Sequence, residues 1–244
     1  MTLKLSHFKL LSFDCYGTLI DWETGIWHAL HSLVSQSEHQ ISRDEALTAF
    51  AQFEPEQEIE TPHLLYREIL SKVHAKLASF WGIHTTDEMN NAFGVSVGDW
   101  PAFPDTVEAL GYLKQHYSLV ILSNVDRLNF SSTSKRLATP FDAVCTAEDI
   151  GTYKPNLRNF EYLVEKCQNL GVQKKDILHV AQSLYHDQRP AERIGLARCW
   201  INRRHDTGKG SGATKAVDHL PVVDFQFPSL AALAEAHRND LMLG

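Results

Sequence analysis

The stretch "LSFDCYGTLID", Leu11–Asp21, decides which fold this chain is expected to adopt. Its first part has the length and apolar composition of a buried strand, and that strand ends in Asp14. A Gly-Thr turn follows, and Tyr16 stands two residues after the acid. Asp14 either caps this turn or contributes to a site at the edge of a sheet. The other strand ends of the chain decide between these alternatives.

Apolar runs of strand length recur along the chain. They cover residues 8–13, 118–123, 142–147, 176–182, 197–202 and 221–225. Helical patterns at 104–117, 155–171 and 229–238 separate or follow these runs. Near-continuously apolar strands that alternate with helices are typical of a parallel sheet covered on both faces. The predicted fold is therefore α/β, with a doubly wound, Rossmann-like parallel sheet.

The helix expected at 104–117 has a regular apolar pattern and a predicted start. The residues expected on its buried face are Val107, Leu110, Leu113 and Tyr117. Asp105 and Glu108 have the spacing of a capping box, which satisfies free backbone N–H groups at the start of a helix.

One region interrupts the alternation of strands and helices. Between about Trp22 and Gly98 there is no good strand pattern, only helical ones. We therefore expect an all-helical cap domain at 22–98, inserted after the first strand, and a core domain made of 1–21 and 99–244. Such a cap would lie over the carboxyl end of the first strand, where sheets of this kind bind ligands.

Composition narrows the partners and the compartment. The 244 residues are 43% hydrophobic with a net charge of −7, and basic residues do not cluster with aromatic ones, so we expect no nucleic-acid partner. No apolar run is long enough to span a bilayer, and the N-terminus lacks a signal-peptide pattern, so no membrane partner is expected. Four scattered cysteines indicate a reduced, cytoplasmic location.

A glycine-rich segment at 207–215, "TGKGSGATK", contains residue types found in phosphate-binding loops. Its lysines do not occupy the places that the order G-x-x-x-x-G-K-[ST] requires. A surface loop is the favoured interpretation.

Polar residues with complementary chemistry stand at or just beyond the ends of predicted strands. They are Asp14, Ser123, Asn124, Lys154 and Asp187. A carboxylate at position 14 can act as a nucleophile, and a lysine within about 4–6 Å would keep it ionised. Ser123 and Asn124 offer hydrogen bonds, and Asp187 can deprotonate water. Each residue alone is compatible with a turn, a cap or a solvated loop, whereas their joint occurrence favours a catalytic site.

These stretches resemble the four motifs of the haloacid dehalogenase superfamily. The matching sequences are "DCYGTL", "LSN", "YKP" and "HVAQSLYHD". The resemblance covers almost all of the chain, and the helical insert stands where this superfamily places a cap domain. Superfamily phosphatases usually have a second aspartate two residues after the nucleophile, where this chain has Tyr16. A phenol is a poor proton donor at neutral pH, and a halide leaving group needs no proton.

The sequence is therefore most similar to the L-2-haloacid dehalogenase (type II) branch. The resemblance implies Asp14 as nucleophile, Thr18 orienting it, Lys154 supporting it and Asp187 assisting water. It implies that Cys15 (through its backbone) and Tyr16 line the substrate site, with Ser123 and Asn124 contacting carboxylate and halide. The expected reaction converts small 2-haloalkanoic acids to 2-hydroxy acids without a metal or other cofactor, and a homodimer is possible.

The sequence departs from this branch at several positions. Phe160 stands where the dehalogenases have a tyrosine, and Gln182 and Leu184 replace a serine and an asparagine. The branch uses a cap arginine, for which the insert offers Arg43 and Arg67, both expected to be solvated. His186, beside Asp187, is expected to be partly exposed and incidental.

Two alternatives therefore stay open. One is a Mg²⁺-dependent phosphatase of a small phosphorylated metabolite, weakened because Gln182 replaces a usual acidic residue of the fourth motif. The other is a diverged member with altered or lost chemistry. In each case the partner is a small molecule, and the identity of the substrate depends on side chains of the insert.

Overall fold

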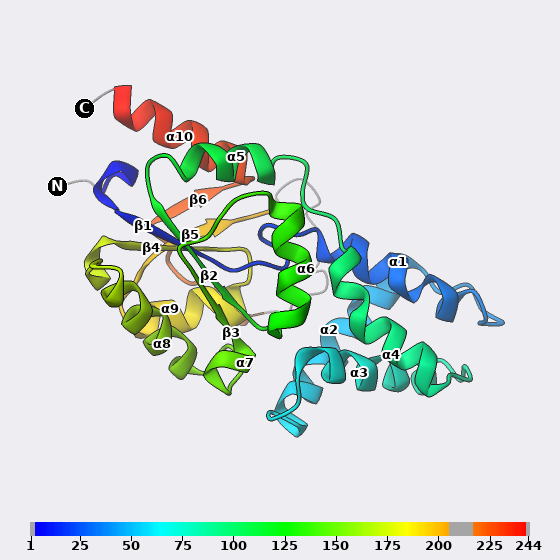
Figure 1. Ribbon diagram of the computed structural model, residues 1–244. Coiled ribbons are helices and arrows are strands. Elements are labelled where there is room, and N and C mark those ends of the chain that lie inside the picture. Colours follow the sequence, from blue (N-terminus) through cyan, green and yellow to red (C-terminus); the bar gives the residue numbers. More distant parts are fainter. Residues whose placement is uncertain (1–2, 205–216, 243–244) are drawn as a thin grey trace.

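The core of the protein is one parallel sheet of six strands, seen in a computed structural model that describes residues 3–204 and 217–242 (Figure 1). The strand order is β3-β2-β1-β4-β5-β6, and every neighbouring pair is parallel. The strands are β1 (Leu10–Phe13), β2 (Ser118–Ser123), β3 (Ala143–Thr146), β4 (Ile177–Ala181), β5 (Ala197–Ile201) and β6 (Phe225–Phe227). The predicted α/β, doubly wound fold is confirmed.

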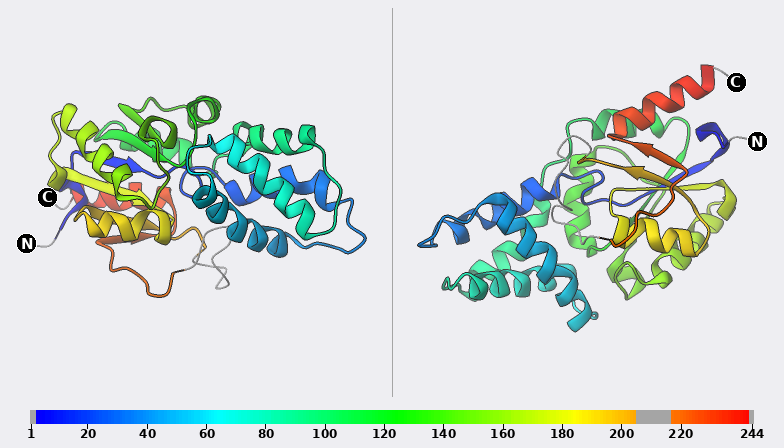
Figure 2. Two further views of the ribbon diagram at one scale, coloured as in Figure 1. Left: turned by 90° about the horizontal axis from the view of Figure 1, so that it is seen from below. Right: turned by 180° about the vertical axis from the view of Figure 1, so that it is seen from behind.

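Helices cover both faces of the sheet (Figure 1 and Figure 2). The α-helices that follow the insert are α5 (Thr106–Leu113), α6 (Arg127–Leu137), α7 (Ala147–Ile150), α8 (Leu157–Asn169), α9 (Arg189–Arg193) and α10 (Leu230–Met242). Short helical segments are η1 (Leu5–His7), η2 (Ser96–Asp99), η3 (Lys174–Asp176) and η4 (Leu184–Gln188). No helix within the described ranges is long and apolar enough to cross a bilayer.

Alternate residues of the strands enter two separate apolar clusters, because successive side chains of a strand point to opposite faces. Leu11 and Phe13 of β1 pack in the cluster that contains Leu110 of α5 and Leu230 of α10. Leu10 packs in the cluster on the opposite face, together with residues of α8. The central strands are thus buried on both sides, as their apolar sequences predict.

Two local predictions for α5 are wrong. Asp105 is the N-cap residue but makes no side-chain cap; its carboxylate instead accepts hydrogen bonds from Arg203 Nη1 (2.7 Å) and from the backbone N–H of Ala231 (3.0 Å). Val107, expected on the buried face, is 41% exposed. Distant partners therefore replace the local cap that the sequence spacing suggests.

The last strand begins later than the sequence predicts. The apolar run at 221–225 does not form a strand up to Asp224, and β6 begins at Phe225. The backbone N–H of Asp224 donates to Arg198 O, and its carboxylate accepts from the N–H of Arg198, so this residue joins the sheet edge through polar contacts (3.1 and 2.8 Å). The glycine-rich segment 207–215 lies outside the described residues.

The regular elements between residues 22 and 98 are all helical, as predicted. It contains α1 (Trp22–Val34), α2 (Arg43–Glu60), α3 (Tyr66–Phe80) and α4 (Asp87–Val95). Ser42 and Glu45 form a capping box at the start of α2. These helices lie together beside one end of the sheet (Figure 1 and Figure 2). The assignment of 22–98 as a separate cap domain stays a prediction.

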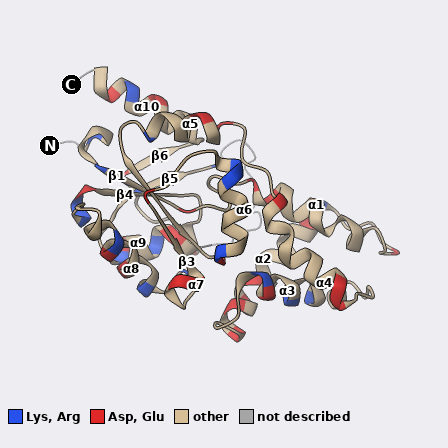
Figure 3. Cartoon of the chain, in the orientation of Figure 1, with Lys and Arg blue, Asp and Glu red and all other residues tan. Residues whose placement is uncertain are grey.

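Charged side chains are spread over the helices and connections. In the cartoon of Figure 3, the blue basic positions and the red acidic positions are both scattered over several helices and connections. The expectation that nucleic acid is not a partner stays a prediction.

Candidate active site

A buried lysine joins two aspartates where the central strands end. Lys154 Nζ lies 2.8 Å from Asp14 Oδ1, 2.8 Å from Asp187 Oδ1 and 3.1 Å from the carbonyl oxygen of Leu122. Asp14 follows β1, and Asp187 belongs to η4, the segment after β4. Because β2, β1 and β4 are parallel neighbours, their carboxyl ends meet at one edge of the sheet. The structure therefore brings together three residues that the sequence suggested as catalytic.

The charges in this cluster shift one another's pKa values. Burial raises the pKa of Asp14, an effect opposed by Lys154 and reinforced by the negative charge of Asp187. Burial also acts to raise the pKa of Asp187, but Lys154 and His179 outweigh it and hold that pKa below its usual value. The two carboxylates in turn raise the pKa of Lys154 despite its burial. Lys154 is therefore a permanent cation between them.

The turn after β1 orients the Asp14 carboxylate. Thr18 Oγ1 donates to Asp14 Oδ2 at 2.6 Å and accepts from the backbone N–H of Gln182 at 2.9 Å. Gly17 has a φ of +91°, and a Cβ there would lie 3.1 Å from both Gln182 Oε1 and Trp22 Nε1. Glycine is therefore needed at position 17 for the left-handed backbone, and threonine at position 18 supplies the hydroxyl donor.

The two polar residues at the end of β2 differ in their contacts. Asn124 binds the backbone of Lys154 through both amide atoms, with distances of 2.6 and 3.0 Å, and also donates to Glu58 Oε1 at 3.2 Å. Its amide thus holds the lysine backbone in place. Ser123 is 2% exposed, and its hydroxyl has no hydrogen-bond partner among the described residues.

The residues next to the proposed nucleophile have different surroundings. Tyr16 lines the cavity, with its hydroxyl 2.8 Å from Thr133 Oγ1 and its ring edge-on to Trp100. Burial raises the pKa of Tyr16 further, which makes the phenol a still weaker acid. The Cys15 side chain is buried outside the cavity lining, and burial raises the pKa of its thiol. Only the backbone of Cys15 is therefore available to line the substrate site, which is the role that the resemblance implies.

His179 is a member of this network that the sequence did not reveal. Its Nε2 lies 3.1 Å from Asp187 Oδ1, and its Nδ1 lies 2.9 Å from Ser12 Oγ. The ring packs edge-on against Phe160, which lies in the apolar cluster beneath the sheet. The signal in the sequence was a single histidine within the apolar strand "ILHVA". The histidine fixes the orientation of Asp187 from the side opposite the cavity.

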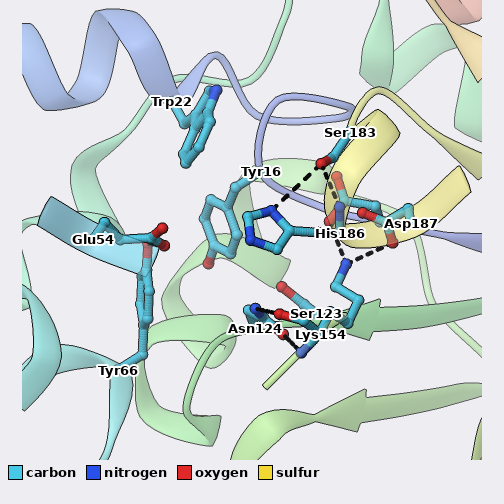
Figure 4. Close-up of a pocket in the computed structure, with 11 residues that line it drawn as sticks. Tyr16, Trp22, Glu54, Tyr66, Ser123, Asn124, Lys154, Ser183, His186 and Asp187 are labelled. Atoms are coloured by element: carbon cyan, nitrogen blue, oxygen red, sulfur yellow. Dashed lines mark hydrogen bonds and ion pairs between the residues drawn. The ribbon is translucent and has the colours of Figure 1, made fainter. Parts of the chain in front are cut away.

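A cavity of about 40 Å³ lies next to these groups (Figure 4). Its predicted lining residues are Asp14, Tyr16, Ser123, Asn124, Lys154 and Asp187. Its other lining residues are Trp22, Glu54, Tyr66, Ser183 and His186. The insert therefore contributes Trp22, Glu54 and Tyr66 to the wall. No motif in the sequence points to these three positions, and Glu54 stands in "FEPEQEIE", whose polar composition is typical of a solvated helix face.

His186 and Arg67 are less exposed than expected, whereas Arg43 is exposed as expected. His186 is 9% exposed and lines the cavity, so the expectation of a partly exposed, incidental residue is wrong. Arg67 binds Asp126 at 3.2 Å, and Arg43 donates to Thr24 at 3.1 Å. Neither arginine lines the cavity, and Gln182 and Leu184 do not line it either.

The donor set around Asp14 is a poor fit for Mg²⁺. Both Asp14 oxygens already accept hydrogen bonds, from Lys154 and from Thr18, and Lys154 lies between the two aspartates. Asp187 Oδ2 is the carboxylate oxygen of this pair without a partner in the described structure. A different group, Glu54, Glu58 and His186, has ligand atoms within 4.8 Å of one another.

A known protein family and several known proteins are similar to this chain. The model of the haloacid dehalogenase-like hydrolase family matches residues 8–193. The chain is 24% identical over 209 residues to (S)-2-haloacid dehalogenase 4A of Burkholderia cepacia, covering 79% of this chain and 82% of that protein. It is 26% identical over 122 residues to pyrimidine 5'-nucleotidase YjjG of Escherichia coli strain K12, covering 48% of this chain and 52% of that protein.

Among solved structures, the L-2-haloacid dehalogenase of Xanthobacter autotrophicus with chloropropionic acid covalently bound superposes with a TM-score of 0.75 at 18% identity. That alignment covers 95% of this chain and 98% of the dehalogenase, which shows that the two share a fold. The family match extends over most of the 244 residues and includes β1, the insert and β4. This chain belongs to the haloacid dehalogenase-like hydrolase family.

Proposed function

We propose that this hydrolase displaces halide from small 2-haloalkanoic acids, with Asp14 as the nucleophile. The observation that carries the proposal is the Asp14 carboxylate itself, which is held by Lys154 and Thr18 and lines the cavity. The resemblance to (S)-2-haloacid dehalogenase 4A supports the substrate class. Helices α1–α4 would act as the cap that closes over this site.

In the first step, an Asp14 oxygen forms a bond to the α-carbon while the carbon–halogen bond breaks and its electron pair leaves with the halide. The product of this step is an aspartyl ester. Lys154 and Thr18 hold the carboxylate in one orientation, which supplies most of the acceleration through positioning. Tyr16, a weak acid bonded to Thr133, is compatible with a leaving group that needs no proton.

In the second step, water attacks the carbonyl carbon of the ester. The bond between that carbon and the ester oxygen breaks, which releases a 2-hydroxyalkanoate and restores the carboxylate. Asp187 can receive the proton of the water, because Lys154 and His179 keep it ionised by lowering its pKa and because its Oδ2 has no partner among the described residues. Three expectations stay predictions. They are that no metal or other cofactor is needed, that the chain forms a homodimer, and that it is cytoplasmic.

The test measures chloride release from 2-chloropropionate in the presence of EDTA, together with one turnover in heavy-oxygen water. We expect chloride release, loss of turnover in Asp14→Asn, and the oxygen label in the Asp14 carboxylate. Asp99→Asn is the matched control, since the Asp99 carboxylate is exposed and paired only with Arg136 among the described residues. No chloride from any short haloacid, or phosphoester hydrolysis that rises with added Mg²⁺, would contradict the proposal.

A further inference from the structure

Two buried glutamates of the insert lie at the site, Glu54 in the cavity lining and Glu58 beside Asn124. Glu54 and Glu58 are four residues apart on α2, so they share one face of the helix. They are 4% and 5% exposed. Figure 4 shows the Glu54 carboxylate pointing into the space that Tyr16 and His186 also face. Glu58 reaches the same region, because it accepts a hydrogen bond from Asn124.

The partners of these glutamates in the described structure are neutral. Glu54 Oε1 accepts from Tyr66 Oη at 3.2 Å, and Glu58 Oε1 accepts from Asn124 Nδ2 at 3.2 Å. Within the described ranges, no lysine or arginine forms an ion pair with either carboxyl group. Burial raises the pKa of both glutamates, that of Glu54 to about 7. Their ionised forms therefore have no ion-pair partner in the described structure, and a cationic ligand would supply one.

The acceptor groups lie close enough together to share one cation. Ligand atoms of Glu54, Glu58 and His186 all lie within 4.8 Å of one another. Acceptors around an ammonium, with N–H···O distances of about 2.9 Å, are about 4.7 Å apart, and ligands of a transition metal at about 2.1 Å are up to about 4.2 Å apart. Both kinds of cation fit within this limit, so the other residues of the cavity decide between them.

Other residues of the cavity suit an ammonium group. The aromatic residues Tyr16, Trp22 and Tyr66 line the cavity, and aromatic faces attract cations. The Ser123 hydroxyl is buried, lines the same cavity and lacks a partner among the described residues, so it offers one further acceptor for an N–H group. The cavity volume of about 40 Å³ limits the ligand to a short chain.

We propose that Glu54 and Glu58 are specificity-determining residues that select small substrates carrying a protonated amine. This inference rests on the proposed function, so the substrate would be a short amino-substituted 2-haloalkanoate and the product an amino-substituted 2-hydroxyalkanoate. The amine lies against the two glutamates and His186, while the halogen-bearing carbon faces Asp14. The positive charge of the amine stabilises the ionised forms of Glu54 and Glu58.

The experiment compares the binding of two product analogues by calorimetry, so it needs no turnover. The pair is 3-amino-2-hydroxypropanoate and 2,3-dihydroxypropanoate, which differ by an ammonium in place of a hydroxyl. We expect the amine to bind at least about tenfold more tightly, because a charged hydrogen bond is worth about that much. Glu54→Gln and Glu58→Gln should remove the preference. Glu56→Gln is the control, because Glu56 is exposed on the same helix.

Three results would overturn the inference. They are equal binding of the two analogues, a preference that survives Glu54→Gln and Glu58→Gln in folded protein, and tight binding of Mn²⁺ or Zn²⁺ alone that either variant abolishes. Thermal melting of the variants checks that they fold. Chloride release from 2-chloropropionate without amine preference would leave the proposed function standing, whereas amine preference without chloride release from any haloacid would contradict the proposed function alone.

Discussion

Replacing Glu54 by glutamine should stabilise the protein at alkaline pH and change its stability much less at acidic pH. Glu54 is buried, and burial raises its pKa from 4.5 to about 7. The folded chain therefore keeps a proton that the unfolded chain has already released between these two values. Because the unfolded state then binds fewer protons, the wild-type free energy of unfolding falls as the pH rises from 4.5 through 7. Glutamine carries no titrating proton and retains an acceptor for Tyr66.

The magnitude follows from the shift of the pKa. One pKa unit corresponds to about 1.4 kcal/mol, so the full penalty above pH 7 is about 3 kcal/mol, of which about 1 kcal/mol is already present at pH 5. Glu54→Gln should thus raise the free energy of unfolding by about 2 kcal/mol more at pH 8.5 than at pH 5. A side chain that is 4% exposed leaves solvent little opportunity to reduce this effect.

Equilibrium urea unfolding at the two pH values measures the difference, with Glu56→Gln as the exposed control on the same helix. The control should show no comparable dependence on pH. An equal effect of Glu54→Gln at pH 5 and pH 8.5 would refute the reasoning, since it would mean that the folded protein does not hold the proton. A destabilised variant at pH 8.5 would mean that an ionised Glu54 has a favourable partner.

Three further outcomes follow from the site. Lys154→Met leaves the buried Asp14 and Asp187 carboxylates without their cation, so we expect a loss of about 3–5 kcal/mol in the free energy of unfolding and more than about 100-fold in turnover, measured by urea unfolding and chloride release. Thr18→Val removes a 2.6 Å hydrogen bond to Asp14 and should lower kcat about 10- to 100-fold, whereas Thr18→Ser should recover most of it; equal loss in both variants would argue against the hydroxyl. In a pH profile of kcat/KM, the acid limb should lie above 3.8, because the pKa of Asp14 is raised and the ionised form is the nucleophile; a limb at or below 3.8 would contradict this role.

The sequence by itself was enough to predict the central fold and the proximity of the residues that we propose as reactive. Strands such as 118–123 are apolar on both faces, and this local pattern suffices to predict a covered parallel sheet. Asp14 and Lys154 are 140 positions apart, yet both follow strands or connections whose carboxyl ends must meet once the strands are parallel neighbours. Their proximity is therefore a consequence of topology that the order of motifs already contains.

Only the tertiary structure decided the far wall of the cavity and several local details. Asp105 has the sequence of a capping residue but binds Arg203, because a charged partner from a distant segment is stronger than a local cap. Glu54 and Glu58 belong to a helix whose polar sequence is typical of a solvent-facing surface, and His186 offers no periodic signal. Glu58 contacts Asn124, the residue after β2, and Glu54 and His186 line one cavity although they belong to α2 and η4. Such packing depends on side chains far apart in the chain, which no local pattern of residues can specify.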